Sequence, residues 1–256
     1  MKGSAKMYTF EYKFYPDLTK IDIMDYYDEK ISWFLSSLLK NGQLLDQHDN
    51  IVQVGESLMC FCLAFEEDSL DVKYYNKYCS DYLSQLIDVS KKPPEYKLIG
   101  KSVGLSNCCS CQEHSYYILF ATSCAFYSPI MCGDCNLPMP LYKFPKIDDE
   151  IEYSNIIYWE AKYQAFDSLF MLTDIGEKYG YQQISNIKSK LSIEGLKICV
   201  DMAKLMEKPF YYFIHKYYSL QKNYCSKCGA YWKLDKALHG LYTHKCDNCL
   251  ILSDSP

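Results

Sequence analysis

The sequence predicts an α+β protein with an N-terminal ferredoxin-like unit, two cysteine-rich ribbons and a helical segment between the ribbons. Three observations support this fold class. Strand and helix patterns follow the order βαββαβ over residues 1–104, two pairs of cysteines occur twice further on, and helical periodicity dominates the stretch between them. The expected domains are 1–104 (ferredoxin-like), 105–146 (first ribbon), 147–219 (helical segment ending in a strand) and 220–256 (second ribbon).

The first half of the N-terminal unit has clear strand and helix signals. Residues 7–15 are rich in aromatic side chains that partly alternate, and Pro16 closes this expected strand. Asp22 is expected to cap a helix whose apolar residues recur at steps of three and four. This helix should end at the turn-forming pair Asn41-Gly42, because glycine readily adopts the conformation that terminates helices.

The second half of the unit should mirror the first. Residues 43–47 and 51–65 are interpreted as two strands separated by a polar turn at 48–50. A second helix is expected to begin at Asp68 or Ser69 and to place one row of apolar residues on its buried face; the row is Leu70, Tyr74, Tyr78, Tyr82 and Leu86. Residues 96–103 should form the last strand of the unit.

The C-terminal segments alternate between ribbon and helix signals. Residues 116–126 form a strand-like apolar run between cysteine pairs, and a long helix follows with its apolar row at Ile156, Trp159, Tyr163, Phe166 and Phe170. Gly176 and Gly180 should end this helix. A short helix over 181–190 and a further helix capped by Ser192 come next; Pro209 stops the latter before a strand at 210–218.

Two sets of four cysteines have the spacing of metal ligands. Each set has two C-x-x-C pairs, separated by 20 residues in the first set and 17 in the second; the predicted ligands are Cys108, Cys111, Cys132 and Cys135, then Cys225, Cys228, Cys246 and Cys249. Four thiolates suit tetrahedral Zn²⁺ and leave no open coordination position. The sequence therefore predicts two structural zinc ions as cofactors.

Several alternatives stay open for these cysteines. All eight could be ordinary buried residues, or a C-x-x-C pair could be a redox couple. In the first ribbon, Cys109 is the reserve ligand beside Cys108, and His114 and Cys124 lie in the same segment. His244 is expected to contact a ligand rather than the metal. The remaining cysteines, Cys60, Cys62, Cys79 and Cys199, are expected in the core.

Composition and charge restrict the possible functions. The net charge is −5, and all 27 basic residues are lysine, so the chain lacks the arginine fork that reads guanine and clamps phosphate. No apolar run is long enough to cross a bilayer, and residues 1–10 lack the apolar region of a secretory signal. Fourteen cysteines without an export signal favour a reducing compartment, so a cytoplasmic location is expected.

No catalytic motif accompanies the cysteines. The five histidines are scattered, and no nucleophile elbow, zinc-protease helix or phosphate-binding loop occurs, so we expect no enzyme activity. The 26 tyrosines can anchor a protein interface, or can stack on bases. A lysine-lined face around the second ribbon is also possible; its members would be Lys216, Lys222, Lys227, Lys233, Lys236 and Lys245.

Four stretches of the chain carry a family resemblance: Cys132-Gly-Asp-Cys135 with Leu137-Pro-Met-Pro-Leu-Tyr142, Pro209-Phe-Tyr-Tyr212, Cys225-Ser-Lys-Cys-Gly229 and Lys245-Cys-Asp-Asn-Cys249-Leu. In these stretches, and from about Met7 to Ser253, the chain resembles an uncharacterised bacterial zinc-ribbon family described as possibly nucleic-acid-binding. The resemblance implies two zinc ribbons and, by the family's description, contact with nucleic acid.

Three function classes follow. The acidic charge, the tyrosines and the missing catalytic set favour binding of a protein partner, as in a bacterial immunity protein that neutralises a toxin, or in an adaptor. The alternative is a zinc-ribbon regulator that binds nucleic acid. An enzyme has the least support, and no membrane partner is expected.

Overall fold

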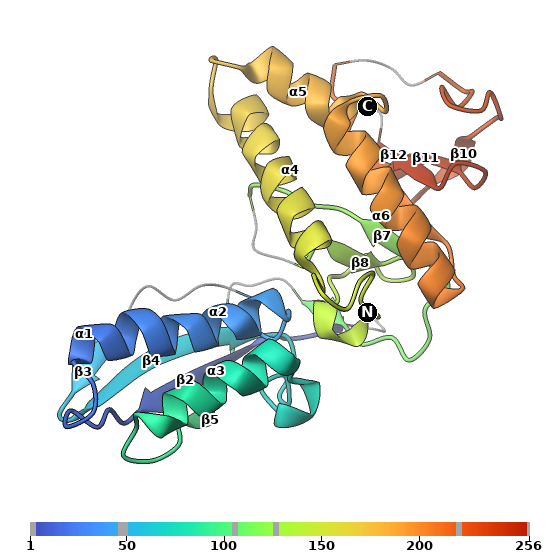
Figure 1. Ribbon diagram of the computed structural model, residues 1–256. Helices are drawn as coiled ribbons and strands as arrows, with labels where there is room; N and C mark the ends of the chain where they lie inside the picture. The colour runs from blue at the N-terminus through green and yellow to red at the C-terminus, as the bar shows by residue number, and fades with distance from the viewer. Residues whose placement is uncertain (1–3, 46–50, 104–106, 125–127, 219–221, 255–256) are drawn as a thin grey trace. The chain divides into compact units, whose positions relative to one another are not determined.

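The computed structural model describes residues 4–45, 51–103, 107–124, 128–218 and 222–254. The chain forms two compact units (Figure 1). The N-terminal unit contains Ala5–Cys108 and Pro140–Lys143, and the C-terminal unit contains Met1–Ser4, Cys109–Met139 and Phe144–Pro256. The helical segment, the second predicted ribbon and most of the first fall in the C-terminal unit, whereas Cys108 and Pro140–Lys143 of the first ribbon fall in the N-terminal unit. The predicted domain limits stay predictions. No helix in the described part of the chain is long and apolar enough to cross a bilayer.

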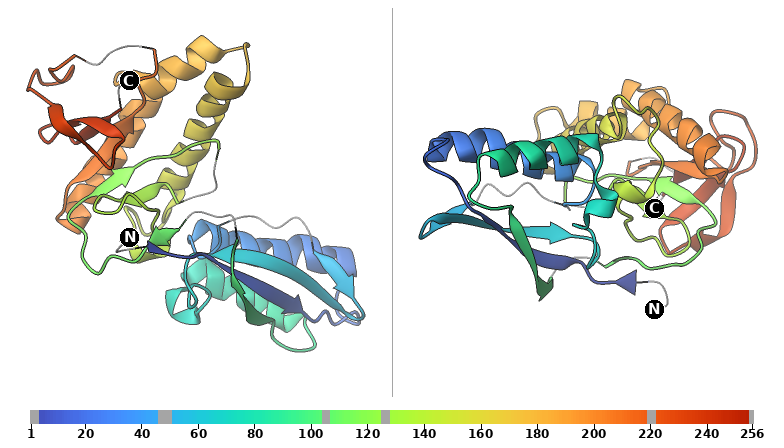
Figure 2. Two further views of the ribbon diagram at one scale, coloured as in Figure 1. Left: turned by 180° about the vertical axis from the view of Figure 1, so that it is seen from behind. Right: turned by 60° about the horizontal axis from the view of Figure 1, so that its bottom comes forward.

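The N-terminal unit is built on a four-stranded antiparallel sheet in the order β3-β4-β2-β5. The strands are β2 (Tyr8–Phe14), β3 (Val52–Val54), β4 (Ser57–Ala64) and β5 (Glu95–Lys101). The helices cover one face of this sheet (Figure 2). Strand β2 alternates as a half-covered strand should, because Phe10, Tyr12 and Phe14 are buried in the core.

The first helical region agrees with its predicted limits. It comprises α1 (Ile23–Asp25), a π-helical stretch η1 (Tyr26–Ile31) and α2 (Ser32–Lys40). The Asp22 carboxylate accepts a 2.8 Å hydrogen bond from the Met24 amide, which confirms the predicted N-cap. The π stretch was not predicted, since it changes the hydrogen-bond register without changing the apolar pattern.

The second helix begins later than predicted. Asp71 caps only a short 3₁₀ turn, η2 (Val72–Tyr74), and Tyr75 is extended, so α3 (Lys77–Asp88) starts anew with Asn76 as its cap. The buried face consequently contains Cys79 and Leu86, whereas Tyr78 is exposed. The prediction of a helix starting at Asp68 or Ser69 was wrong because a local side-chain cap competed with the apolar periodicity.

The second and third strands of this sheet in chain order were also assigned the wrong limits. Both β3 and β4 lie within the run 51–65, and Gly55, with φ of 63°, makes the turn between them. Residues 43–45 form no strand, and the predicted polar turn at 48–50 lies outside the described residues. In β4 the side chains of Cys60 and Cys62 are buried on one face, and Cys79 joins the same core, as expected.

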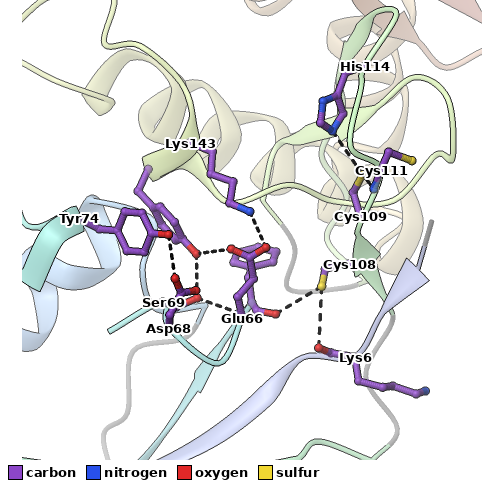
Figure 3. Close-up of polar contacts among 12 residues, drawn as sticks. Lys6, Glu66, Asp68, Ser69, Tyr74, Cys108, Cys109, Cys111, His114 and Lys143 are labelled. Carbon is purple, nitrogen blue, oxygen red and sulfur yellow. Dashed lines mark hydrogen bonds and ion pairs between the residues drawn. The ribbon is translucent and has the colours of Figure 1, made fainter. Parts of the chain in front are cut away.

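A short later segment, Pro140–Lys143, belongs to the N-terminal unit. It contains the 3₁₀ turn η3 (Leu141–Lys143). The Tyr142 hydroxyl lies 2.9 Å from Ser69 Oγ and donates to Glu66 at 3.0 Å, and Lys143 forms an ion pair with Glu66 (Figure 3). The chain therefore completes the N-terminal unit only after it has passed through the first cysteine set.

The C-terminal unit contains a six-stranded mixed sheet in the order β10-β11-β12-β9-β7-β8. Its central strand β9 (Phe210–Ile214) is buried throughout and pairs in parallel with β7 (Tyr117–Leu119) and β12 (Ile251–Ser253). The outer strands are β8 (Ile130–Cys132), β10 (Lys233–Leu238) and β11 (Tyr242–Cys246). The predicted strands at 116–126 and 210–218 are shorter in the structure, and 125–127 lie outside the described residues.

Three helices accompany this sheet: α4 (Ser154–Leu172), α5 (Glu177–Ser185) and α6 (Lys190–Met206). The predicted apolar row of α4 is largely confirmed, with Ile156, Trp159, Tyr163 and Phe170 buried. Gly176 caps α5 and Gly180 lies inside it, so the limits 181–190 were wrong. Ser189, not Ser192, caps α6, because its side chain accepts from the Ser192 amide.

Candidate metal centres

The first candidate metal centre, called site 1, consists of Cys109, Cys111, Cys132 and Cys135, whose sulfur atoms all lie within 4.8 Å of one another. The strand β8 ends at Cys132, and the chain then turns so that the Asn136 amide donates to the Cys132 carbonyl at 2.8 Å. On the other side, the Cys111 amide donates to Cys109 Sγ at 3.4 Å. Two turns thus face each other across four thiols.

The structure places Cys109, rather than Cys108, in site 1. The two residues form β6 (Cys108–Cys109), and consecutive strand residues point to opposite faces. Cys108 Sγ donates instead to the carbonyl of Phe65 at 3.3 Å (Figure 3). The four sulfurs that the structure brings together therefore include Cys109 in place of the predicted Cys108, and the first pair has C-x-C rather than C-x-x-C spacing. The short strand β1 (Ser4–Ala5) precedes the N-terminal sheet.

Burial and hydrogen bonding distribute the protons unevenly within site 1. A hydrogen bond from Cys109 lowers the pKa of Cys132 to about 5, and the amides of Cys135 and Asp134 add to this effect. Burial raises the pKa of Cys135 to about 12. Amide donors that stabilise a thiolate are what a metal-binding sulfur requires.

The second candidate metal centre, called site 2, consists of Cys225, Cys228, Cys246 and Cys249, again with all sulfurs within 4.8 Å. Cys246 ends β11, and Cys228 Sγ lies 3.5 Å from Cys246 Sγ. The Cys225 amide donates to the Ala230 carbonyl and the Gly229 amide to the Cys225 carbonyl, both at 2.8 Å. The structure brings together all four cysteines that were predicted for this site.

The residue after the last cysteine of three turns has left-handed backbone geometry. Asn136, Gly229 and Leu250 have φ angles of 56°, 73° and 54°. Asparagine and glycine tolerate this conformation well, whereas leucine is disfavoured there. The turn at Leu250 nevertheless has the same geometry as the other two. The Cys246–Cys249 turn thus keeps a strained residue where the cysteine pair needs the bend.

In site 2 the exposed thiol of Cys228 has a lower pKa than the buried thiol of Cys246. The Ala230 amide, followed by the thiol of Cys249, lowers the pKa of Cys228 to about 7. Burial raises the pKa of Cys246 to about 11. Each site therefore contains one thiol that ionises most easily and is held by backbone amides.

Two histidines and a further cysteine lie near the two sites without joining the sulfur groups. His114 Nε2 is 3.6 Å from Cys109 Sγ, and its ring stacks on Tyr117. His244 is buried against Trp232; its Nδ1 lies 2.9 Å from the Thr243 hydroxyl, and its Nε2 has no hydrogen-bond partner in the described part of the chain. Cys124 is exposed and lies outside site 1.

The two sites are joined by direct contacts that the sequence did not reveal. The hairpin β10–β11 of site 2 reaches the turn of site 1, where His239 Nε2 lies 2.6 Å from the Gly133 carbonyl oxygen. The Tyr242 hydroxyl donates to Asn136 Oδ1 at 2.8 Å. These partners are 106 residues apart in the sequence, so no local spacing could indicate them.

A charged cluster strengthens the same junction. Lys245 Nζ lies over the rings of Tyr211 and Tyr116, 4.9 Å and 5.5 Å from their centroids. It also pairs with Asp247 at 2.9 Å, and the Tyr211 hydroxyl donates to the same carboxylate. The cluster therefore joins Tyr211 of β9 and Tyr116 of the site 1 segment to Lys245 and Asp247 of the site 2 segment.

Two family models match adjacent parts of the chain. Residues 111–215 match the family model described as "Domain of unknown function (DUF2310)". Residues 217–255 match a second model, "Domain of unknown function (DUF8594)". The first model contains three cysteines of site 1 and all of α4 to β9, and the second contains site 2.

Two curated proteins from Haemophilus influenzae (strain ATCC 51907 / DSM 11121 / KW20 / Rd), each named "Uncharacterized protein", are similar to this chain. Each is 27% identical over 164 residues, or 62% of this chain. The alignment covers 80% of the first relative and 62% of the second, so the chain spans less than two thirds of the latter. No solved structure matches the chain. The comparisons thus relate the chain to bacterial proteins named without a function.

Proposed function

We propose that this protein is a non-catalytic zinc-binding scaffold that presents a surface to a protein partner. The observation that carries the proposal is the pair of compact four-thiol groups, sites 1 and 2, within a single folded unit. Zn²⁺ held by four sulfurs at about 2.3 Å would separate them by about 3.8 Å, which fits sulfurs that lie within 4.8 Å of one another. When bound, the metal would supply folding energy.

The ligand chemistry supports a structural role for both metals. Each site offers four thiols, so a bound metal would have no position left for water or substrate. Backbone amides stabilise the thiolates of Cys132 and Cys228, and no disulfide joins the fourteen cysteines. Tetrahedral sulfur sites select zinc or iron–sulfur chemistry, so the colour and metal content of the purified protein distinguish the two.

The fold supports finer assignments of the same kind. We assign a ferredoxin-like topology to the N-terminal unit, because its four strands are antiparallel and follow the order β3-β4-β2-β5 with two helices between them. We assign zinc-ribbon character to the segments around site 1 and site 2, because each contains a pair of short antiparallel strands next to a cysteine turn, β7–β8 for site 1 and β11–β12 for site 2. Neither assignment alone indicates a function.

The charge distribution favours a protein partner over nucleic acid. Of the lysines expected around site 2, Lys245 is paired with Asp247, and burial lowers the pKa of Lys216. The chain is acidic and lacks arginine, so its attraction for phosphate is weak. Toxin neutralisation, as by an immunity protein, and an adaptor role in the cytoplasm remain predictions within this proposal.

Metal content is the first test of the proposal. Protein purified without added metal should contain two zinc ions per chain, and Cys228→Ser should reduce this to one. Ser226→Ala, in the same turn, is the matched control and should keep both. A colourless protein with two zinc ions supports the structural sites, whereas one or no zinc ion, or an iron chromophore, contradicts them.

Partner class is tested by a salt titration. Binding to duplex and single-stranded DNA and RNA should be undetectable even at low salt, where phosphate contacts are strongest. Tight, salt-sensitive binding would instead establish the alternative, a nucleic-acid regulator. Co-purification with the product of the adjacent gene would test the immunity prediction directly.

A further inference from the structure

A groove of about 580 Å³ lies between helix α6 and the first turn of site 2. Its walls come from the segment before α6, from α6 itself and from the site 2 turn. The lining residues are Ile187, Lys188, Ile193, Leu196, Lys197, Val200, Ser226 and Lys227. All of them belong to the C-terminal unit.

The floor of the groove is aliphatic and accessible. Ile193 and Val200 are seven residues apart on α6 and therefore share a face; they are 58% and 41% exposed. Leu196 is buried between them. Concave aliphatic surface of this kind is costly to leave in water and is typical of a binding site for apolar side chains.

The rim of the groove is positively charged. Lys188, Lys197 and Lys227 come from three different segments, and no carboxylate belongs to the described residues that line the groove. Lys197 is partly neutralised by Asp201 at 3.2 Å, whereas Lys188 and Lys227 form no ion pair within the described segments. This positive rim stands out because the chain as a whole carries a net charge of −5.

We propose that the groove binds an acidic segment of a protein partner that carries aliphatic side chains. The aliphatic residues of the partner would fill the floor over Ile193 and Val200, and its carboxylates would pair with the lysine rim. This inference rests on the proposed protein-binding function and names the chemistry of the partner.

Nucleic acid fits the groove less well. No aromatic side chain is present in the described lining on which a base could stack, and an aliphatic floor would desolvate phosphate without compensating it. Three lysines alone give weak phosphate binding at physiological salt.

The groove also depends on site 2. Ser226 and Lys227 lie between Cys225 and Cys228 in the first turn of site 2. A metal bound at site 2 would fix the conformation of this turn, and with it the positions of both residues. Loss of metal from site 2 should therefore remove one wall of the groove, and recognition of the partner should depend on that metal.

The test uses fluorescence anisotropy with the full zinc-loaded chain and a labelled synthetic peptide. The peptide has leucines at steps of three and four and glutamates between them; a second peptide has lysine in place of each glutamate. The glutamate peptide should bind and the lysine peptide should not. Val200→Asp and Lys227→Glu should each weaken binding by about tenfold or more.

Two matched variants control for general effects. Leu205→Asp changes another exposed apolar residue of α6, and Lys236→Glu reverses another exposed lysine near site 2; neither lines the groove, and both should leave binding unchanged. The inference is overturned if the glutamate peptide does not bind, if both peptides bind equally, if the groove variants have no effect, or if Lys227→Glu abolishes binding of single-stranded nucleic acid instead. A zinc count of two in the same samples shows that the proposed metal function survives such a result.

Discussion

The Tyr242 hydroxyl donates a 2.8 Å hydrogen bond to Asn136 Oδ1, and so connects the hairpin of site 2 with the turn that follows Cys135 in site 1. Asn136 is one of the residues with positive φ, and its amide also closes the turn onto Cys132. A substitution at Tyr242 should therefore alter the turn that holds Cys132 and Cys135, the predicted metal ligands of site 1.

Tyr242→Phe should destabilise the C-terminal unit by about 1 kcal/mol, because it removes one partly buried hydrogen bond and leaves the Asn136 amide group without that partner. It should also speed chelator-induced zinc release from site 1, although the substitution lies in the module of site 2. Release can be followed with a coloured zinc chelator in a Cys228→Ser background, where site 1 is the intended metal site. Tyr224→Phe, at an exposed tyrosine, is the control; equal release from both variants would refute the coupling.

Cys109→Ser should reduce the zinc content from two ions to one, because it removes a ligand of site 1, whereas Cys108→Ser should leave two. The two substitutions are matched, since the residues are adjacent and both are buried. Elemental analysis of the purified variants decides between them. If Cys108→Ser lowered the zinc content and Cys109→Ser did not, Cys108 would be the ligand, as the C-x-x-C spacing predicts.

Gly195→Ala should destabilise the C-terminal unit by about 1–3 kcal/mol. An added methyl group would lie 2.3 Å from the ring of Tyr212 and 2.8 Å from Trp159 Nε1, so helix α6 would have to move away from β9. Urea unfolding should show a lower midpoint. Leu205→Ala at an exposed position of the same helix should have little effect, and a similar loss in both variants would argue against the steric cause.

Stability should depend on the ionisation of Glu160. Burial raises the pKa of this half-buried carboxyl to about 8. The unfolded chain ionises near pH 4.3, so between about pH 4.3 and 8 unfolding releases a proton, and the free energy of unfolding falls as the pH rises. Glu160→Gln removes this penalty, so the substitution should be more stabilising at pH 8 than near pH 5.

Urea unfolding of Glu160→Gln and of the wild type at both pH values tests this prediction. Subtracting the wild-type value at each pH cancels the common effect of thiol protonation. Asp174→Asn replaces an exposed carboxylate and should show no such trend. A gain that is the same at both pH values would show that ionisation is not its cause.

The cysteine pattern was predictable because metal ligands must lie close together, and short turns make this a local property of the sequence. The exception, Cys108, shows the limit: two adjacent cysteines satisfy similar spacing rules, and only the alternation of strand β6 decides which one faces the site. The contacts of His239 and Tyr242 could not be predicted, because they depend on how distant segments pack.

In the N-terminal unit, periodicity predicted the order of the elements but not all of their limits. The start of α3 was misplaced because Asn76, and not Asp68, accepts the capping hydrogen bond, a choice that the apolar residues do not encode. The Gly55 turn was missed because the apolar residues on both sides of it were treated as one run, although Gly55, Glu56 and Ser57 interrupt that run. A capping residue in the first case and a turn residue in the second, rather than the apolar pattern, decided the limits.

The parallel pairing of β9 with both β7 and β12 has a consequence for any shortened form of the chain. The match to the first family model ends at residue 215, directly after β9, and β12 lies in the second. A fragment that stops there exposes the buried edge of Phe210–Ile214, with its amide and carbonyl groups unpaired and aromatic residues on both faces. Such a fragment should self-associate through this edge, and proteins that contain only the first domain need another segment to cover it.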